Sequence, residues 1–272
     1  MDPRDGFVEA NGLRFHYLEW GTATHPPLLL LHGFGNQAHI WDPFAATVCQ
    51  RYHMYALDSR GHGDTGHADD YGDELNAIDT LAVCDALGLL HFTLVGFSMG
   101  AANALIVISR RPELVERLVI VDRGPESNPA GRARMSRAIG QARSVFPSRD
   151  EALAYIRMAN PRRSEDLVQA SLRHAFREMP DGSYQLKYDQ KLRDRFLGYA
   201  GSGVDLWKCL EAVRCPTLIV RGGESDILAP EVAEKMVAML PDARLEIVPH
   251  AGHTVMLENP GDFNRVVGAF LP

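Results

Sequence analysis

The sequence has no apolar run near the roughly 20 residues that a membrane-spanning helix needs. The longest such run, PPLLLLHGF, covers only residues 26–34. The opening residues, MDPRDGFVEANG, contain no apolar segment of the signal-peptide kind, so we expect no such peptide. Positive charge is in the minority, with 28 Lys and Arg against 35 Asp and Glu and a formal net charge of −7. This balance argues against a nucleic-acid or anionic-membrane partner, and we expect a cytoplasmic protein.

Cysteine is scarce and scattered. The four cysteines, Cys49, Cys84, Cys209 and Cys215, form no C-x-x-C spacing, so we expect packing thiols in a reducing compartment rather than metal ligands. Internal repeats and low-complexity tracts are also absent from the sequence. The length of 272 residues suffices for one large α/β domain with an insertion, or for two small domains.

The sequence does contain short apolar runs that alternate with helical patterns. Five such runs in the first half predict strands, at 13–21, 26–33, 52–58, 91–97 and 117–122. Between the third and fourth runs, residues 73–88 have a helical period, an acidic start and a glycine at the end. The alternation of strands and helices predicts a parallel sheet with helices on both faces.

The alternation stops between residues 124 and 202, where amphipathic helices are predicted, with a turn and an extended piece at 179–190. It resumes after residue 203, with strands at 215–223 and 243–250. We therefore predict an α/β core at 1–123 and 203–272 and a helical cap at 124–202.

The predicted cap differs in charge from the core. It contains 14 Lys and Arg and 9 Asp and Glu, a balance of +5, which leaves 14 and 26, or −12, for the remainder. The simpler explanation is two solvated faces that attract each other. The alternative is a basic lid that favours acidic substrates.

A serine flanked by glycines, in Gly96-Phe97-Ser98-Met99-Gly100, lies between an apolar strand and a predicted helix. Glycines without Cβ atoms allow a strained strand-to-helix turn that exposes the serine hydroxyl. Ser98 is therefore the candidate nucleophile, and it needs a base, a group that orients the base, and donors for an oxyanion. The Met99 N–H at the start of the helix is the first expected oxyanion donor.

The second donor is expected from the turn HGFG at 32–35, which follows a buried run and leaves the Phe34 N–H free to face the same site. The base should be a histidine beyond the last strand, where VPHAGHT offers His250 and His253. We favour His253, because it lies farther beyond the strand, whereas His250 is almost at the strand end.

The orienting carboxylate has two main candidates. Asp226 lies in the loop after the strand at 215–223, and Asp122 lies at the end of the strand at 117–122, with Glu224 a more distant possibility. We favour Asp226, which lies in the loop before the helix predicted from Pro230 and keeps the expected chain order Ser98, Asp226, His253.

Residues near these motifs are candidates to bind substrate. In the core they are Gly33, Trp41 and Phe97, and in the predicted cap Met158, Phe176 and Tyr184 could close the site. Apolar residues here predict a cleft for small, largely apolar substrates.

Five motifs together resemble those of α/β-hydrolase fold enzymes with a helical cap, over essentially the whole length. They are HGFG at 32–35, DSRGHGDT at 58–65, GFSMG at 96–100, GESD at 223–226 and HAGH at 250–253. The resemblance implies a mostly parallel eight-stranded sheet, a cap inserted after the sixth strand, and an active site between core and cap. Epoxide hydrolases and haloalkane dehalogenases of this fold have aspartate at the nucleophile position, so Ser98 argues against both.

Among serine members the sequence resembles carboxylesterases, enol-lactone hydrolases and meta-cleavage-product hydrolases. The expected function is hydrolysis of a small ester or lactone through Ser98, His253 and Asp226, with no metal and no cofactor. A carbon–carbon bond hydrolase is an alternative, although the tryptophan typical after its catalytic histidine is replaced here by Thr254. A cofactor-free perhydrolase and a binding protein on a hydrolase scaffold are further alternatives. The expected partner is only the small-molecule substrate, and the sequence leaves monomer and homodimer open.

Overall fold

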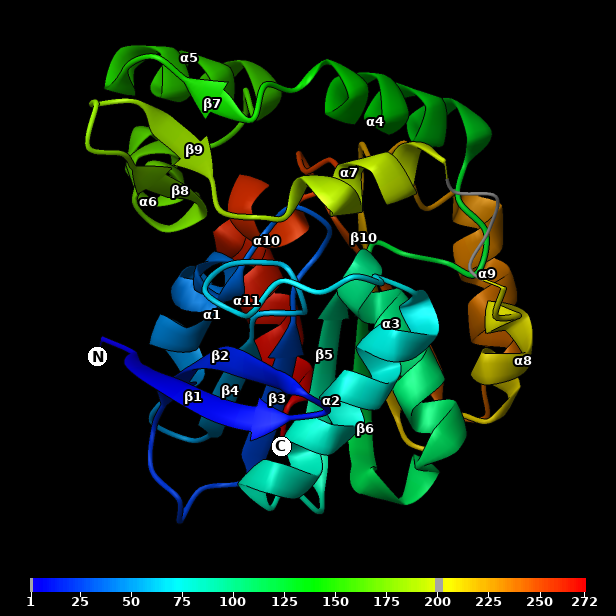
Figure 1. The fold of residues 1–272 in the computed structure, drawn as a ribbon. Coiled ribbons are helices and arrows are strands. Elements are labelled where there is room, and N and C mark those ends of the chain that lie inside the picture. The colour runs from blue at the N-terminus through cyan, green and yellow to red at the C-terminus, as the bar shows by residue number, and fades with distance from the viewer. Residues whose placement is uncertain (1, 199–202) are drawn as a thin grey trace.

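The computed structural model describes residues 2–198 and 203–272. Eight strands form one sheet in the order β1-β2-β4-β3-β5-β6-β10-β11 (Figure 1). Their bounds are β1 Arg4–Ala10, β2 Leu13–Trp20, β3 Pro27–Leu31, β4 His53–Leu57, β5 Phe92–Phe97, β6 Val115–Val121, β10 Thr217–Gly222 and β11 Ala243–Val248. The pairs β1–β2 and β2–β4 are antiparallel and the other pairs are parallel. The expected eight-stranded, mostly parallel sheet is confirmed.

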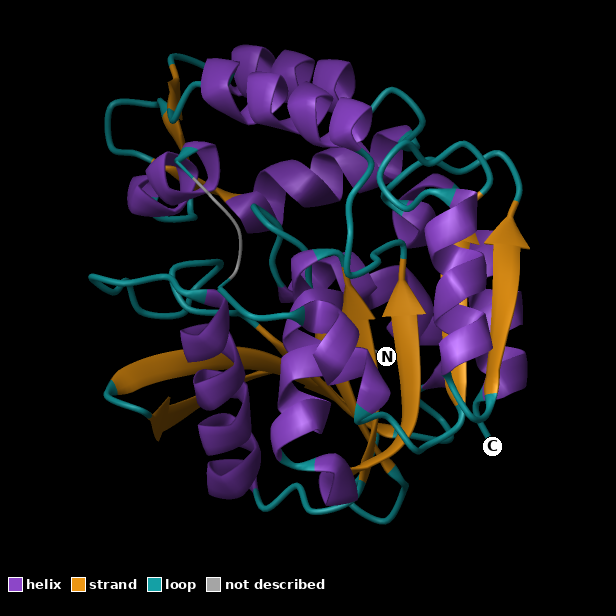
Figure 2. Ribbon diagram, turned by 90° about the vertical axis from the view of Figure 1, so that its right-hand side faces the viewer, coloured by secondary structure: helices purple, strands orange, loops and turns teal. Residues whose placement is uncertain are grey.

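Helices cover both faces of this sheet (Figure 2). One face is covered by α2 (Asp73–Leu87), α3 (Met99–Arg110), α8 (Leu206–Glu211) and α9 (Pro230–Met239). The other is covered by η1 (Ala38–Trp41), α1 (Asp42–Val48), α10 (Val255–Glu258) and α11 (Pro260–Phe270), and a short turn of helix, η2 (Pro112–Leu114), precedes β6. None of the helices in the described residues is long and apolar enough to cross a membrane.

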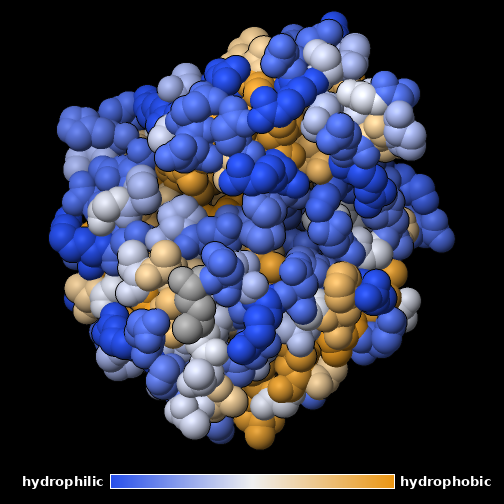
Figure 3. Space-filling model, turned by 90° about the vertical axis from the view of Figure 1, so that its left-hand side faces the viewer, coloured by the Kyte–Doolittle hydropathy of each residue, from blue (hydrophilic) through white to orange (hydrophobic). Residues whose placement is uncertain are grey.

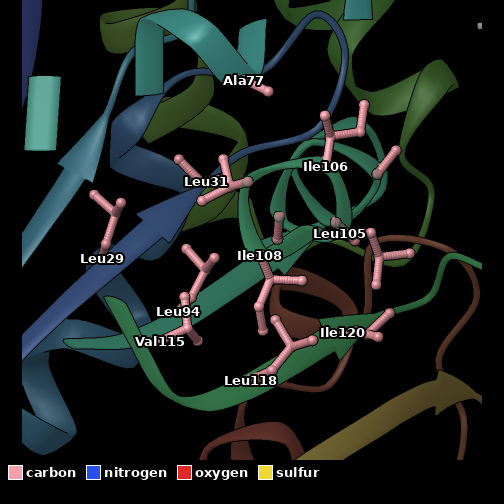
Figure 4. Packing of buried hydrophobic residues seen from close by; sticks show 14 of the residues in the cluster. Leu29, Leu31, Ala77, Leu94, Leu105, Ile106, Ile108, Val115, Leu118 and Ile120 are labelled. Carbon is pink, nitrogen blue, oxygen red and sulfur yellow. The ribbon is translucent and has the colours of Figure 1, made fainter. Parts of the chain in front are cut away.

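The continuous apolar runs of the central strands supply both hydrophobic cores. In β3, Leu29 and Leu31 belong to the core beneath α3, whereas Leu28 and Leu30 belong to the core on the opposite face. Successive strand side chains point to opposite faces, so a strand buried on both sides needs an apolar residue at every position. Figure 4 shows part of the first core, where side chains of β3, β5 and β6 gather against α3.

The segment between β6 and α8 lies above the carboxyl ends of the parallel strands (Figures 1 and 2). We call residues 129–197 the upper segment. It contains α4 (Pro129–Gln141), β7 (Val145–Phe146), α5 (Arg149–Ala159), α6 (Glu165–Ala175), β8 (Phe176–Glu178), β9 (Tyr184–Leu186) and α7 (Gln190–Leu197). The three short strands form a sheet of their own, and α5, α6 and this sheet share a small hydrophobic core. The predicted end of the cap, at residue 202, lies outside the described residues, so the domain boundaries stay a prediction.

Candidate active site

The bend at Ser98 has the strained geometry that the glycine-flanked motif predicts. Ser98 joins β5 to α3 with φ +52° and ψ −110°, a conformation that is costly for a residue other than glycine. A Cβ atom on Gly96 would lie 2.5 Å from the Gly100 carbonyl oxygen, and one on Gly100 would lie 2.3 Å from the Leu31 carbonyl oxygen. Only glycine therefore fits at these two positions, and the chain turns tightly enough to present the Ser98 hydroxyl at the end of the sheet.

Ser98 is the first member of a chain of hydrogen bonds. Its Oγ lies 2.9 Å from Nε2 of His253, and Nδ1 of His253 lies 2.8 Å from Oδ2 of Asp122. With its Nδ1–H donated to Asp122, the imidazole keeps Nε2 free to accept the serine proton. His253 lies in the loop between β11 and α10, and the structure brings it to Ser98 as the motifs predict.

His250, the alternative base, does not reach the site. Its side chain is 91% exposed, and its nearest carboxylate, that of Glu224, lies 3.9 Å away. The preference for His253 over His250 therefore agrees with the geometry.

The carboxylate beside His253 is Asp122, so the prediction that Asp226 orients the histidine is wrong. The Asp122 side chain is fully buried and also accepts hydrogen bonds from the Gly222 N–H, at 3.0 Å, and from the Ser225 hydroxyl. Three donors thus hold the Asp122 side chain in place. Asp122 directly follows β6, which is hydrogen-bonded to β5, whereas Asp226 follows β10, one strand farther from Ser98.

Asp226 instead anchors the upper segment to the core. Arg134 of α4 donates two hydrogen bonds to it, at 2.5 and 2.8 Å, in the forked geometry typical of arginine and carboxylate. Hydrogen bonding to Arg134 lowers the pKa of Asp226 below its usual value. The Asp226 side chain is 42% exposed, as expected for an ion pair at the edge of the cavity.

Two backbone N–H groups beside Ser98 have no helix or strand hydrogen bond within the described residues. Met99 is the first residue of α3, so its N–H has no acceptor within the helix. A Cβ atom on Gly33 would lie 3.2 Å from Cβ of Ser98, which places the backbone of residues 33–34 against the bend. The two predicted donors, Phe34 and Met99, therefore lie on segments that meet at Ser98.

His32 fixes the orientation of the peptide between Gly33 and Phe34. Its Nε2 accepts from the Ser59 N–H, at 3.0 Å, which leaves Nδ1–H to donate to the Gly33 carbonyl oxygen, at 2.8 Å. Burial lowers the pKa of His32, which favours the neutral form with one donor and one acceptor. In a trans peptide the C=O and N–H point in opposite directions, so holding the Gly33 carbonyl also directs the Phe34 N–H.

A cavity of about 1100 Å³ lies between this edge of the sheet and the upper segment. Phe97, Ser98 and His253 line it from the core, and Phe176 and Tyr188 line it from the upper segment. Figure 3 shows one face of the molecule, with hydrophobic side chains visible between hydrophilic ones on its upper half. The cavity is large enough for a small organic substrate above the serine.

Of the three residues predicted to bind substrate from the core, only Phe97 lines the cavity. Trp41 is fully buried and packs against Phe44 and Phe263, with ring centroids 6.4 Å apart in both pairs, so the prediction for Trp41 is wrong. Gly33 is not among the lining residues and instead packs against Phe97, whose ring a Cβ atom would approach to 2.7 Å.

Of the three candidates named in the predicted cap, two contribute to the cavity wall. Met158 and Phe176 line the cavity, whereas Tyr184 does not. Four arginines that also line it, Arg134, Arg143, Arg162 and Arg163, were not singled out in the sequence. Their only sequence signal is the excess of positive charge between residues 124 and 202.

Two groups of histidine and carboxylate side chains in the described residues are close enough together to be tested as metal sites. His39, Asp42 and His174 form one, but the two imidazoles are stacked with centroids 3.5 Å apart and planes at 26°, so their in-plane lone pairs do not converge on one ion. The other group is His16, Asp58 and Asp64, and here Asp58 already accepts hydrogen bonds from His16 and from the backbone N–H of Ala38.

The model of the alpha/beta hydrolase family matches residues 28–266. N-formylmaleamate deformylase of Pseudomonas putida is 31% identical over 98% of this chain and 96% of that protein. The sn-1-specific diacylglycerol lipase ABHD11 of Mus musculus is 29% identical, over 92% and 82% of the two chains.

Solved structures resemble this chain over nearly its full length. An alpha/beta hydrolase from Novosphingobium aromaticivorans has a TM-score of 0.88 and 26% identity, and the match covers 100% of this chain and 99% of that one. E-2-(acetamidomethylene)succinate hydrolase has a TM-score of 0.91 at 22% identity, with 99% of each chain covered, which supports the fold. The five motifs, the observed sheet and the family match agree: the chain is a hydrolase that belongs to the alpha/beta hydrolase family.

Proposed function

We propose that the protein is a serine hydrolase that cleaves carboxylic esters or lactones of small substrates through an acyl-enzyme on Ser98. The observation that carries this proposal is the hydrogen-bonded chain from Ser98 through His253 to Asp122. These three groups are the nucleophile, the base and the orienting carboxylate that covalent acyl transfer requires.

In the first half-reaction Ser98 Oγ attacks the substrate carbonyl carbon while Nε2 of His253 takes the serine proton. Asp122 accepts the Nδ1–H and stabilises the imidazolium. The N–H groups of Phe34 and Met99 donate to the oxyanion, and a donor of this kind is worth about 3–4 kcal/mol of transition-state stabilisation.

The tetrahedral intermediate then collapses, and His253 gives its proton to the leaving alkoxide, which departs as the alcohol. Water enters, His253 takes one of its protons, and the resulting hydroxide attacks the acyl carbon. The second intermediate releases the carboxylic acid, and the proton on His253 returns to Ser98. Apart from the substrate and water, these steps use only side chains and backbone groups of this chain.

A relative supports an ester as substrate. Esterase Rv0045c of Mycobacterium tuberculosis is 28% identical over 93% of this chain. The upper segment covers the cavity, and we infer that it acts as a cap that shields the acyl-enzyme from bulk water.

Amide hydrolysis is a second candidate, favoured by the 31% identity to N-formylmaleamate deformylase. The same serine and histidine would serve, with His253 protonating a leaving nitrogen instead of an oxygen. The carbon–carbon bond hydrolase and perhydrolase alternatives would use the same three residues. The residue after His253 is Thr254, whose hydroxyl donates a hydrogen bond to Glu258 at 2.6 Å, so this side chain has a structural contact.

A series of p-nitrophenyl esters of increasing acyl length tests the proposal. We expect turnover by the wild-type protein that is lost in Ser98→Ala, with a chain-length optimum set by the cavity. Turnover of the matching p-nitroanilides instead would favour amide hydrolysis. No turnover of either series by a folded protein would reject the ester proposal and move the search to ring-cleavage dienoates.

A further inference from the structure

Three of the four arginines on the cavity wall are already paired with carboxylates. Arg134 binds Asp226. Arg143 lies 3.4 Å from Glu151. Arg162 contacts both Glu224 and Glu258. These three guanidinium groups therefore have acidic partners within the protein.

Arg163 differs from the other three. Its Nη1 donates to the Ser171 hydroxyl, at 3.1 Å, and its Nε is buried with no acceptor anywhere in residues 2–198 and 203–272. A guanidinium has five N–H donors in a rigid plane, so most of those of Arg163 remain available. Burial lowers the pKa of Arg163 to about 10, which still leaves the group charged at neutral pH.

Arg163 lies close to Glu258, which contacts the loop that carries the base. Glu258 is close enough to favour its charged form electrostatically, but no hydrogen bond joins the two in the described part of the chain. The Glu258 oxygens accept instead from the backbone N–H groups of Gly252 and Thr254, the residues on either side of His253. A ligand group held by Arg163 would thus lie near the loop that carries the base.

An unpaired charged donor in a cavity is costly unless a ligand supplies the acceptor. A carboxylate fits this role better than a neutral carbonyl, because it offers two oxygens to the planar guanidinium and compensates its charge. The excess of positive charge in residues 124–202 also favours a negatively charged ligand.

We propose that Arg163 is a carboxylate receptor, and that the substrates of this protein carry a free carboxylate in addition to the bond cleaved at Ser98. The inference rests on the proposed function for the cleavage step. It extends that function by naming the substrate class and the residue that selects it.

The test compares two p-nitrophenyl esters of equal length, the monoester of adipic acid and the 6-oxoheptanoate ester. They differ only in a terminal carboxylate against a methyl ketone. We expect the wild-type kcat/KM to favour the carboxylate, and Arg163→Gln to lower that preference about ten- to hundredfold, mainly through KM, as expected for loss of a charged hydrogen bond. Arg163→Lys should restore part of the preference. Arg143→Gln, on the same wall but paired with Glu151, is the matched control and should keep it.

A wild-type protein without preference, or an Arg163→Gln protein that loses both activities equally while its melting temperature is unchanged, would overturn the inference. Binding of monomethyl adipate to Ser98→Ala, measured by calorimetry, separates this inference from the proposed function. Affinity that depends on Arg163 supports the receptor even if no ester is cleaved. Affinity equal in Ser98→Ala and in Ser98→Ala with Arg163→Gln, or no binding to either, contradicts it.

Discussion

Replacing Asp122 with asparagine tests how the base is oriented. The Asp122 carboxylate accepts the Nδ1–H of His253, the Gly222 N–H and the Ser225 hydroxyl, and it is fully buried. An asparagine amide of the same shape has one oxygen and one NH₂ group, so at least one of these three donors would face the NH₂ group and have no acceptor. If the amide NH₂ faces His253, the imidazole must place its proton on Nε2, and it can no longer accept the proton of Ser98.

We expect Asp122→Asn to lower kcat about 10⁴-fold, the loss measured when the orienting aspartate of such a triad is made neutral. That factor corresponds to about 5.5 kcal/mol of transition-state stabilisation. The assay is p-nitrophenyl ester hydrolysis under saturating substrate, with a thermal melt to show that the variant is folded.

The matched control is Asp226→Asn, which removes the other candidate carboxylate. The side chains of Asp226 and its partner Arg134 are both about half exposed, so we expect the variant to lose no more than about 1 kcal/mol of stability and to show only a small change in kcat. An Asp226→Asn protein as impaired as Asp122→Asn, or an Asp122→Asn protein with near-normal kcat, would refute the assignment.

Three further outcomes are expected. Gly100→Ala should lower the free energy of unfolding by about 3 kcal/mol or more in a denaturant titration, because the new Cβ would lie 2.3 Å from the Leu31 carbonyl oxygen; unchanged stability would contradict this steric argument. His32→Ala should lower kcat about ten- to hundredfold at nearly constant KM in the ester assay, because the Gly33 carbonyl loses the hydrogen bond from His32 and keeps only the one from the Asn36 N–H; an unchanged kcat would reject the positioning role of His32. Burial lowers the pKa of His174 to about 4, so the unfolded chain binds more protons and stability should fall between pH 6.5 and 4. The difference in unfolding free energy between His174→Gln and the wild type should therefore shift in favour of the variant by about 1–2 kcal/mol from pH 7 to pH 4, measured by unfolding titrations at both pH values. The same difference at both pH values would contradict this expectation.

Most of the large sheet follows from apolar runs in the sequence, but its first strand does not. β1 is only partly buried and pairs along one edge, so it has no continuous apolar run to reveal it. The strands β7, β8 and β9 have two or three residues each, which is too short for any alternation to be recognised. The helix expected at 73–88 is α2, which ends where Gly88 adopts a left-handed φ of +69°.

Some residues of the site can be predicted from their neighbours in the sequence, whereas others depend on how the strands are ordered in the sheet. Ser98 and the turn around it are encoded locally, because the two glycines and the strand-to-helix change lie within five residues. The choice between Asp122 and Asp226 depends instead on which strand is the neighbour of β5, and chain order does not contain this. Trp41 shows that closeness in sequence to a motif does not place a side chain in the cavity, since η1 directs it into the core.

Covalent labelling with a fluorophosphonate, followed by peptide mapping, tests the central claim most directly, because the reagent reacts with an activated serine. We predict one adduct per chain, on the peptide that contains Ser98, with labelling abolished in Ser98→Ala and strongly slowed in Asp122→Asn. Ester hydrolysis that persists without an adduct on Ser98, or an adduct on another residue that abolishes activity, would contradict the account.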